Sequence, residues 1–190
     1  EGNTANGYRA LWQTTTGDYN TATGAKAMYN NVEGEHNVAV GDSTLYSNSA
    51  GHFNTAVGAK SLFANVEGYY NTATGGKALY TNTSSYNSAH GYEALYRNDD
   101  GTNNVANGYH TMYNNDDGEY NTANGSKALY SNRSGDGNTA NGYQTLYLNT
   151  ANSLTATGFQ ALYTNSTGGF NTAHGYQSLY ANSTGQGNTA

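Results

Sequence analysis

The chain repeats itself about every 17 residues, which leaves few folds open to it. Each unit follows the consensus N-T-A-x-G-x-x-A-L-Y-x-N-x-x-G-x-x, and the spacing falls to 16 in two units. The eleven units begin at Asn3, Asn20, Asn37, Asn54, Asn71, Asn87, Asn104, Asn121, Asn138, Leu154 and Asn171, and a partial twelfth begins at Asn188. A fixed period this short is typical of a solenoid, in which one unit forms one turn, or rung, stacked on the next. We therefore predict a single repeat array over residues 1–190.

A rung of this length has room for two strands of about five residues and two turns. The consensus predicts the first strand at N-T-A-x-G and the second near A-L-Y-x-N. In the first strand, alternation points the recurrent alanine into the interior, and the leucine or methionine of the second strand fills the same space. We expect an all-β parallel β-solenoid, or β-roll, with two short strands per rung. In the alternative, G-Y-x-A-L-Y-x-N forms one helical turn, giving a solenoid with one strand and one helical turn per rung.

Large apolar residues alone are too few to hold this chain together. Leu, Ile, Val and Phe number only 21 of 190 residues, a content common in disordered chains. The absence of Pro, the 19 Tyr and the net charge of −6 argue against disorder, and the 25 Gly suit a fold rich in turns. We expect stacking between rungs to supply the missing cohesion. The Asn at positions 1 and 12, counted from the first residue of each unit, should form ladders of side-chain amides.

Two units are one residue short. Asn71–Tyr86 and Asn138–Ser153 both lack the late glycine of the consensus. Because a deletion within a strand would turn its side chains to the wrong face, we expect the missing residue to fall in an outward loop.

The N-T-A-x-G-x-x-A segment followed by a glycine turn is similar to the S-V-A-I-G-x-x-A-x-A-x-G head repeats of trimeric autotransporter adhesins (YadA-like), with three residues added. The full N-T-A-x-G-x-x-A-L-Y-x-N-x-x-G unit resembles still more closely the arrays of bacterial surface and phage tail-fibre-like proteins. The resemblance covers the whole chain. It implies a left-handed parallel β-roll, assembly as a homotrimer, a cell-surface or virion location, and binding to host or matrix surfaces.

The first strand departs from the adhesin pattern. Adhesin heads carry Val and Ile toward the trimer interior, whereas this chain mostly has Thr followed by Asn, Thr, His or Val, and only Val38 with Val40 gives the apolar pair. A trimer built on this face would have a polar seam. The Thr-rich face could instead bind ice, since T-x-T occurs at Thr21–Thr23, Thr72–Thr74 and Thr155–Thr157. Only three of eleven rungs carry this pattern.

Two aromatic rows are candidates for contacts. The residue after the core leucine is aromatic in every unit from Trp12 to Tyr180, and we expect a packed ladder there, with a sugar-binding track as the alternative. A second, patchier row at position 6 is the better candidate for exposed ligand-binding contacts. Its tyrosines are Tyr8, Tyr92, Tyr109, Tyr143 and Tyr176, with Phe159 in the same row.

Two acidic pairs lie one rung apart. Asp99–Asp100 and Asp116–Asp117 are separated by 17 residues, so stacking would bring four carboxylates together. Unscreened carboxylates repel one another. Either the loop opens into water, or a hard cation such as Ca²⁺ bridges the oxygens. Calcium is the one cofactor that the sequence suggests.

Four N-x-S/T sequons mark possible glycosylation sites in the loop half of the rung. They begin at Asn82, Asn132, Asn165 and Asn182.

No catalytic constellation is found. The five His occupy several repeat positions without a Ser or Asp at a recurring spacing, and no phosphate-binding or zinc motif occurs. The acidic balance argues against nucleic acid as a partner, and no apolar stretch is long enough for membrane insertion.

We predict a non-enzymatic, extracellular structural or adhesive stalk or filament segment of a cell surface or virion appendage. Its expected partners are copies of itself, as a homotrimer or filament polymer, and host or matrix glycans. The alternative is a specific surface-binding module, either a glycan-binding adhesin head or an ice-binding face.

Overall fold

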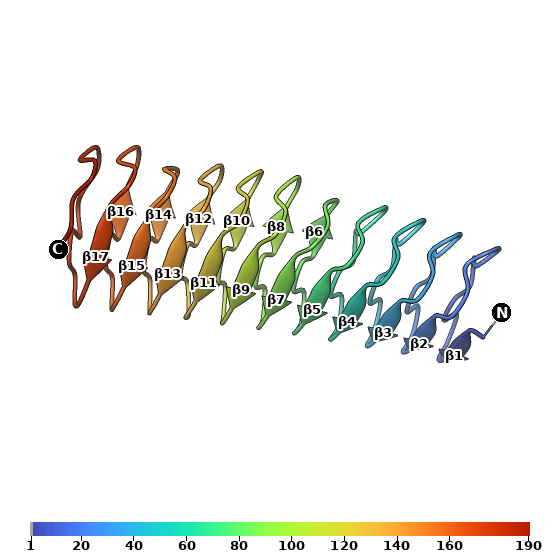
Figure 1. Ribbon diagram of the computed structural model, residues 1–190. Helices are drawn as coiled ribbons and strands as arrows, with labels where there is room; N and C mark the ends of the chain where they lie inside the picture. Colours follow the sequence, from blue (N-terminus) through green and yellow to red (C-terminus); the bar gives the residue numbers. More distant parts are fainter. Residues whose placement is uncertain (1) are drawn as a thin grey trace.

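The chain winds into a solenoid of stacked rungs, described for residues 2–190 in a computed structural model (Figure 1). Successive rungs follow one another along a single direction from the N-terminal to the C-terminal end. None of the described residues is helical, so none belongs to a helix that could cross a membrane. The prediction of an all-β parallel solenoid is confirmed, and the alternative with a helical turn in each rung is wrong.

One strand from every rung joins a continuous parallel sheet, which we call sheet A. Its register pairs equivalent positions of neighbouring rungs, Ala5 with Ala22 and Ala22 with Ala39. The eleven strands are β1 (Thr4–Asn6), β2 (Thr21–Thr23), β3 (Val38–Val40), β4 (Thr55–Val57), β5 (Thr72–Thr74), β7 (Ser88–His90), β9 (Val105–Asn107), β11 (Thr122–Asn124), β13 (Thr139–Asn141), β15 (Thr155–Thr157) and β17 (Thr172–His174). From β2 to β17 the central alanine is fully buried, as the alternation of side chains predicts.

The second sheet, sheet B, is smaller than expected. Its six strands are β6 (Thr81–Asn82), β8 (Arg97–Asn98), β10 (Asn114–Asn115), β12 (Ser131–Asn132), β14 (Leu148–Asn149) and β16 (Thr164–Asn165). The prediction of a five-residue strand over A-L-Y-x-N is therefore wrong. Only its last two residues form a strand, and among the described residues they do so only in the rungs between residues 71 and 170.

The A-L-Y segment is a turn because two consecutive side chains point inward. Ala27 and Met28 are both fully buried, whereas a strand would place them on opposite faces. Left-handed angles at Lys26 (φ 54°) and Met28 (φ 49°) allow this, and the same two positions have positive φ in every rung. Such angles cost about 1–3 kcal/mol per residue. Hydrogen bonds between rungs offset the cost, since Lys26 N–H donates to Tyr8 O and Met28 N–H donates to Thr44 O.

The glycine after each strand of sheet A allows the rungs to approach closely. Gly24 has φ 136°, and a Cβ added there would lie 2.3 Å from Gly41 O in the next rung. Any side chain at this position would push neighbouring rungs apart.

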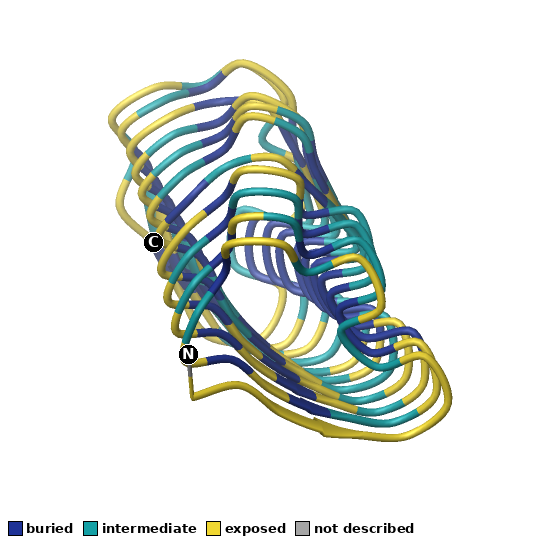
Figure 2. Ribbon diagram, turned by 90° about the vertical axis from the view of Figure 1, so that its right-hand side faces the viewer, coloured by how far each residue is buried: buried dark blue, intermediate teal, exposed yellow. Residues whose placement is uncertain are grey.

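The interior consists of apolar side chains and amides, and the buried residues line it between the two more exposed end rungs (Figure 2). Two asparagine ladders form the amide part. Asn37 N–H donates to Asn20 Oδ1 at 3.0 Å, and Asn48 Nδ2 donates to Asn31 Oδ1 at 2.7 Å. Both ladders also bind the late glycine, because Gly51 O accepts from Asn37 Nδ2 and Asn48 Nδ2 at 2.7 and 2.8 Å. The predicted amide ladders are confirmed, and hydrogen bonding offsets the cost of burying these groups.

In the two short rungs another carbonyl replaces that of the missing glycine. Asn71 Nδ2 and Asn82 Nδ2 donate to Ser84 O at 2.8 and 2.7 Å, and Ala151 O has the same role in the second short rung. The sequence predicts a loop that points wholly outward, and this prediction is wrong because one carbonyl of the loop points inward. In a full-length rung the inward carbonyl lies three residues after the ladder asparagine, as Gly51 does after Asn48. In a short rung it lies two residues after, as Ser84 does after Asn82, and this shift accommodates the deletion.

Candidate binding surfaces

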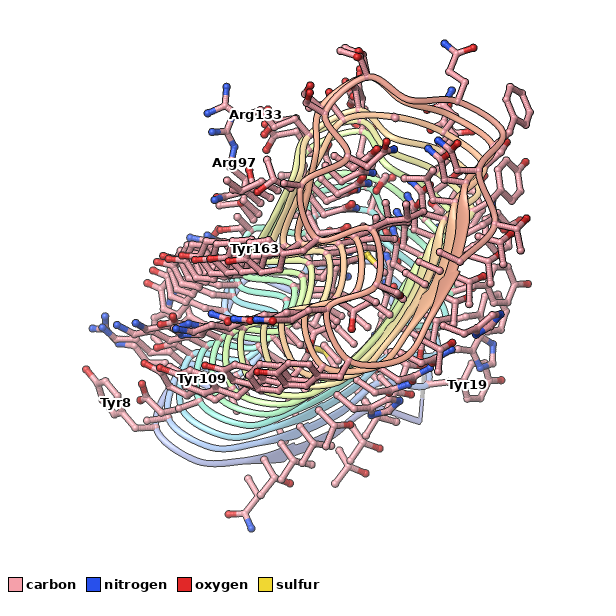
Figure 3. The ribbon with its side chains drawn as sticks, turned by 90° about the vertical axis from the view of Figure 1, so that its left-hand side faces the viewer. Tyr8, Tyr19, Arg97, Tyr109, Arg133 and Tyr163 are labelled. Atoms are coloured by element: carbon pink, nitrogen blue, oxygen red, sulfur yellow. The ribbon has the colours of Figure 1, made fainter. Side chains whose placement is uncertain are left out.

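The aromatic residue after the core leucine forms a stacked ladder on one face, where Tyr163 is labelled in Figure 3. From Tyr29 to Tyr180, adjacent ring centroids lie 4.9 to 5.3 Å apart with planes within 11° of each other. Burial raises the pKa of the Tyr147 and Tyr163 phenols, and neighbouring phenols add to the effect. Each interior ring is covered on both faces, so only ring edges reach solvent. Because sugars stack on ring faces, this ladder serves cohesion between rungs.

The row at position 6 is more exposed than this ladder and lies on the same side, where Tyr109 is labelled in Figure 3. The candidate tyrosines Tyr8, Tyr92, Tyr109, Tyr143 and Tyr176 are 43% to 73% exposed. They form separate groups. Tyr92 and Tyr109 stack with centroids 6.0 Å apart, Tyr143 and Tyr176 each stack on Phe159 at 5.3 Å, and Tyr8 lies beside Arg9. The structure therefore offers short aromatic patches at these positions, not a continuous track.

A row of polar side chains at position 7 includes one largely buried charge. Lys77 Nζ lies 3.0 Å from Glu93 Oε1, and His110 Nε2 lies 2.9 Å from Glu93 Oε2. Burial by itself raises the pKa of Glu93, but hydrogen bonds from Lys77 and Tyr92 and the charges of Lys77 and His110 outweigh it, so the pKa is lowered. The hydrogen bond and charge of Glu93 raise the pKa of Lys77 to about 12. This pair is ionised at neutral pH.

The two acidic pairs are placed beside an arginine. Arg97 Nη2 lies 2.9 Å from Asp99 Oδ2, and Arg97 Nε lies 3.3 Å from Asp116 Oδ1. The guanidinium thereby offsets part of the repulsion between the carboxylates. Within residues 2–190 no group of three or more His, Cys, Asp or Glu is arranged to hold a metal ion. Calcium at Asp99, Asp100, Asp116 and Asp117 stays a prediction.

Three of the four sequon asparagines lie inside the solenoid. Asn82, Asn132 and Asn165 are fully buried members of the position-12 ladder, whereas Asn182 is partly exposed. The Nδ2 of Asn132 donates to the preceding ladder asparagine and to the glycine carbonyl of its own rung. A glycan is attached to this same nitrogen, so modification of the three buried residues would require the ladder to open.

A third aromatic row was missed in the sequence. The last residues of the first five units, Tyr19, His36, Phe53, Tyr70 and Tyr86, stack with centroids 4.9 to 5.6 Å apart. All five are exposed and have positive φ. Tyr19 lies on the opposite side of the solenoid from Tyr109 and Tyr163 (Figure 3). The sequence does show this row, as an aromatic or histidine residue at the end of five consecutive units. The consensus hides it because the last position of the unit varies along the whole chain.

The outer face of sheet A changes along the solenoid. Val38 and Val40 form an apolar spot and are 37% and 39% exposed. Further along, Asn107, Asn124 and Asn141 are joined by side-chain hydrogen bonds of 2.7 and 2.8 Å. The T-x-T strands β2, β5 and β15 are not neighbours in the sheet.

Each of these surfaces is built from positions that recur from rung to rung. The resemblance to adhesin heads and tail-fibre arrays stays a prediction from the sequence motifs. Comparison with protein-family models, curated proteins and solved structures finds no match to the chain.

Proposed function

We propose that the chain is a segment of an extracellular structural or adhesive rod without catalytic activity. Continuity carries the proposal: sheet A runs unbroken through eleven strands over an interior filled by alanine, leucine and hydrogen-bonded asparagine side chains. Eleven rungs at about 4.8 Å each give a rod about 50 Å long. Continuous backbone ladders resist bending, and surface positions recur at every rung. Both properties suit a spacer that presents contacts along its length.

Self-association, as a homotrimer or a filament polymer, belongs to this proposal. The outer face of sheet A is the surface we favour because its backbone is fully paired and its side chains form extended rows. Val38 and Val40 would add an apolar contact to an otherwise polar seam. The net charge of −6 disfavours nucleic acid, and we propose no membrane insertion by this segment.

The second candidate is a specific surface-binding module. The exposed stack of Tyr143, Phe159 and Tyr176 favours host or matrix glycans as its ligands, since its end rings have open faces. Ice binding has less support because the T-x-T strands are separated within sheet A.

Antibody labelling of intact source cells or particles tests the proposal. An antibody against the array should stain unpermeabilised material, and deletion of the array should shorten the appendage in electron micrographs by about 50 Å. Staining that requires permeabilisation would contradict an extracellular rod. A glycan array and an ice-recrystallisation assay on the isolated chain test the second candidate, which selective binding would support.

A further inference from the structure

A groove of about 430 Å³ lies at the second short rung, Asn138–Ser153. A second hollow of about 330 Å³ also borders Thr150. Thr150 belongs to the loop from which one residue is missing, and the loop above β14 is smaller than those above β12 and β16 (Figure 1). The deletion therefore opens a notch between the longer loops of the neighbouring rungs. The lining of the larger groove includes Ser131, Arg133, Leu148, Thr150, Thr164 and Ser166.

Arg133 brings a free positive charge to this groove. Its side chain is exposed, and no acidic group of residues 2–190 forms an ion pair with it. Arg97 differs, because Asp99 and Asp116 both contact its guanidinium. Figure 3 shows Arg97 and Arg133 projecting from the solenoid close to each other in that view, on the side that carries Tyr163. A guanidinium is a planar fork of donors that matches a carboxylate in two parallel hydrogen bonds.

The rest of the groove supplies an apolar surface and hydroxyl oxygens. Leu148 is 45% exposed, at a repeat position where the other rungs carry alanine or a polar residue. Thr150 Oγ1 donates to Ser166 O, and Ser166 Oγ donates to Ser183 O at 2.8 Å. Because these hydroxyl protons are committed to carbonyls, their oxygens are left to accept hydrogen bonds from a ligand. A sugar ring offers both an apolar C–H face and hydroxyl donors.

We propose that this groove binds a carboxylated sugar, such as a hexuronate unit of an acidic polysaccharide. The carboxylate pairs with Arg133, the ring lies over Leu148, and ring hydroxyls donate to Thr150 and Ser166. The volume lies within the range of about 300–1,000 Å³ found for small-molecule sites. The inference rests on the proposed adhesive role and gives it a ligand class.

A single planar negative charge fits this site better than a phosphate group. The single guanidinium of Arg133 can bind one carboxylate through two parallel hydrogen bonds. The rung before Arg133 carries acidic residues on its loop. The backbone N–H groups of Asp116 and Asp117 donate to Arg133 O at 3.0 and 2.9 Å, so their carboxylates lie on the adjoining loop. They would repel a second negative charge on the ligand.

Titration of the whole chain with an oligohexuronide, followed by amide NMR shifts, tests the site. We expect a Kd on the order of 1 mM, with the largest shifts at Leu148 and Thr150. The neutral oligosaccharide of the same linkage, and acetate alone, should bind at least about tenfold more weakly. Arg133→Gln should weaken uronide binding at least about tenfold. Lys60→Gln, a control that removes an exposed positive charge in a rung far from the groove, should leave it unchanged.

A second variant closes the groove without removing the arginine. Insertion of serine before Thr150 together with Ala151→Gly recreates the N-S-T-G loop that the next rung carries at residues 165–168. Circular dichroism and the unfolding midpoint verify its fold, and we expect uronide binding to be lost. Absence of binding to the natural chain, equal binding of the neutral sugar, or binding that survives Arg133→Gln or the loop insertion would overturn the site. Those failures leave the rod intact, because cell labelling and imaging do not depend on a sugar site.

Discussion

The two short rungs absorb the same deletion with different chemistry. In the first, Ser84 supplies a carbonyl to both asparagine ladders, and its hydroxyl donates to Gly101 O at 2.6 Å. In the second, Ala151 supplies the carbonyl alone. The comparison teaches that the shortened loop requires an inward carbonyl two residues after the ladder asparagine, whereas the side chain at this position contributes hydrogen bonds in the first loop only.

The contrast continues in the rung that follows. Asn87 continues the position-1 ladder, and its Oδ1 accepts from Asn104 N–H at 3.0 Å. Leu154 interrupts the ladder because it has no side-chain oxygen to accept from Asn171 N–H. It is only 1% exposed, so it contributes apolar burial in place of a hydrogen bond.

The row of side chains at position 7 also differs between the two short rungs, since it is charged at the first and uncharged at the second. Lys77 of the first short rung pairs with Glu93 of the rung that follows it, whereas Gln144 Oε1 of the second short rung accepts from Gln160 Nε2 of its following rung at 2.8 Å. The one charged residue of the first short rung, Lys77, is thus paired with the rung that follows it. The second short rung has no charged residue, so it offers no ionic partner to Arg133 of the preceding rung.

Exchanging the residues that follow the two short rungs should give the largest effect. Asn87→Leu removes the acceptor for Asn104 N–H and a donor to Gly101 O, and we expect it to lower the free energy of unfolding by about 3 kcal/mol. Leu154→Asn loses about 2 kcal/mol of apolar burial but restores an acceptor, so its net change should stay within about 1 kcal/mol. Urea unfolding measures both, with hydrogen exchange locating the weakened rungs. Equal losses would contradict the comparison.

Exchanging the inward loop residues should give an intermediate effect. Ser84→Ala removes the hydroxyl that donates to Gly101 O and accepts from Asn98 Nδ2 at 2.8 Å, and we expect a loss of about 1 kcal/mol. Ala151→Ser should change stability by less than about 0.5 kcal/mol. Thermal unfolding of the two variants measures the difference. If Ala151→Ser stabilises as much as Ser84→Ala destabilises, a serine hydroxyl has the same value in both loops and the proposed difference between them is wrong.

The acid dependence of stability should show the smallest difference. The folded-state pKa of Glu93 is lowered, so its carboxylate contributes stability that is fully present above the pKa of the unfolded chain. This contribution is lost as the pH falls through the lowered pKa. Glu93→Gln should therefore reduce the acid sensitivity of the unfolding midpoint, while Gln160→Ala should shift the midpoint equally at pH 7 and at low pH. Identical pH profiles of the natural chain and Glu93→Gln would show that the pair adds nothing.

The sequence predicts the period, the register of sheet A and the amide ladders, because stacking 17-residue units places equivalent residues above one another. The A-L-Y turn could not be predicted, since hydrogen bonds between rungs hold Lys26 and Met28 at angles that neither residue prefers locally. The stack from Tyr19 to Tyr86 was lost by averaging over units that lack it. The short unit Asn138–Ser153 marks the place of the groove at Leu148, but its shape depends on the loops of the adjoining rungs, which the unit itself does not predict.

Spin labels on exposed loop residues of different rungs test the stacking of equivalent residues most directly. The chain has no cysteine, so Glu33→Cys can be combined with Asp117→Cys, five rungs away, or with Thr167→Cys, eight rungs away. A rise of about 4.8 Å per rung predicts distances of about 24 Å and about 38 Å in double electron–electron resonance. Distances that grow in this proportion are the expected result, and similar distances for the two pairs would contradict a rod of rungs in register.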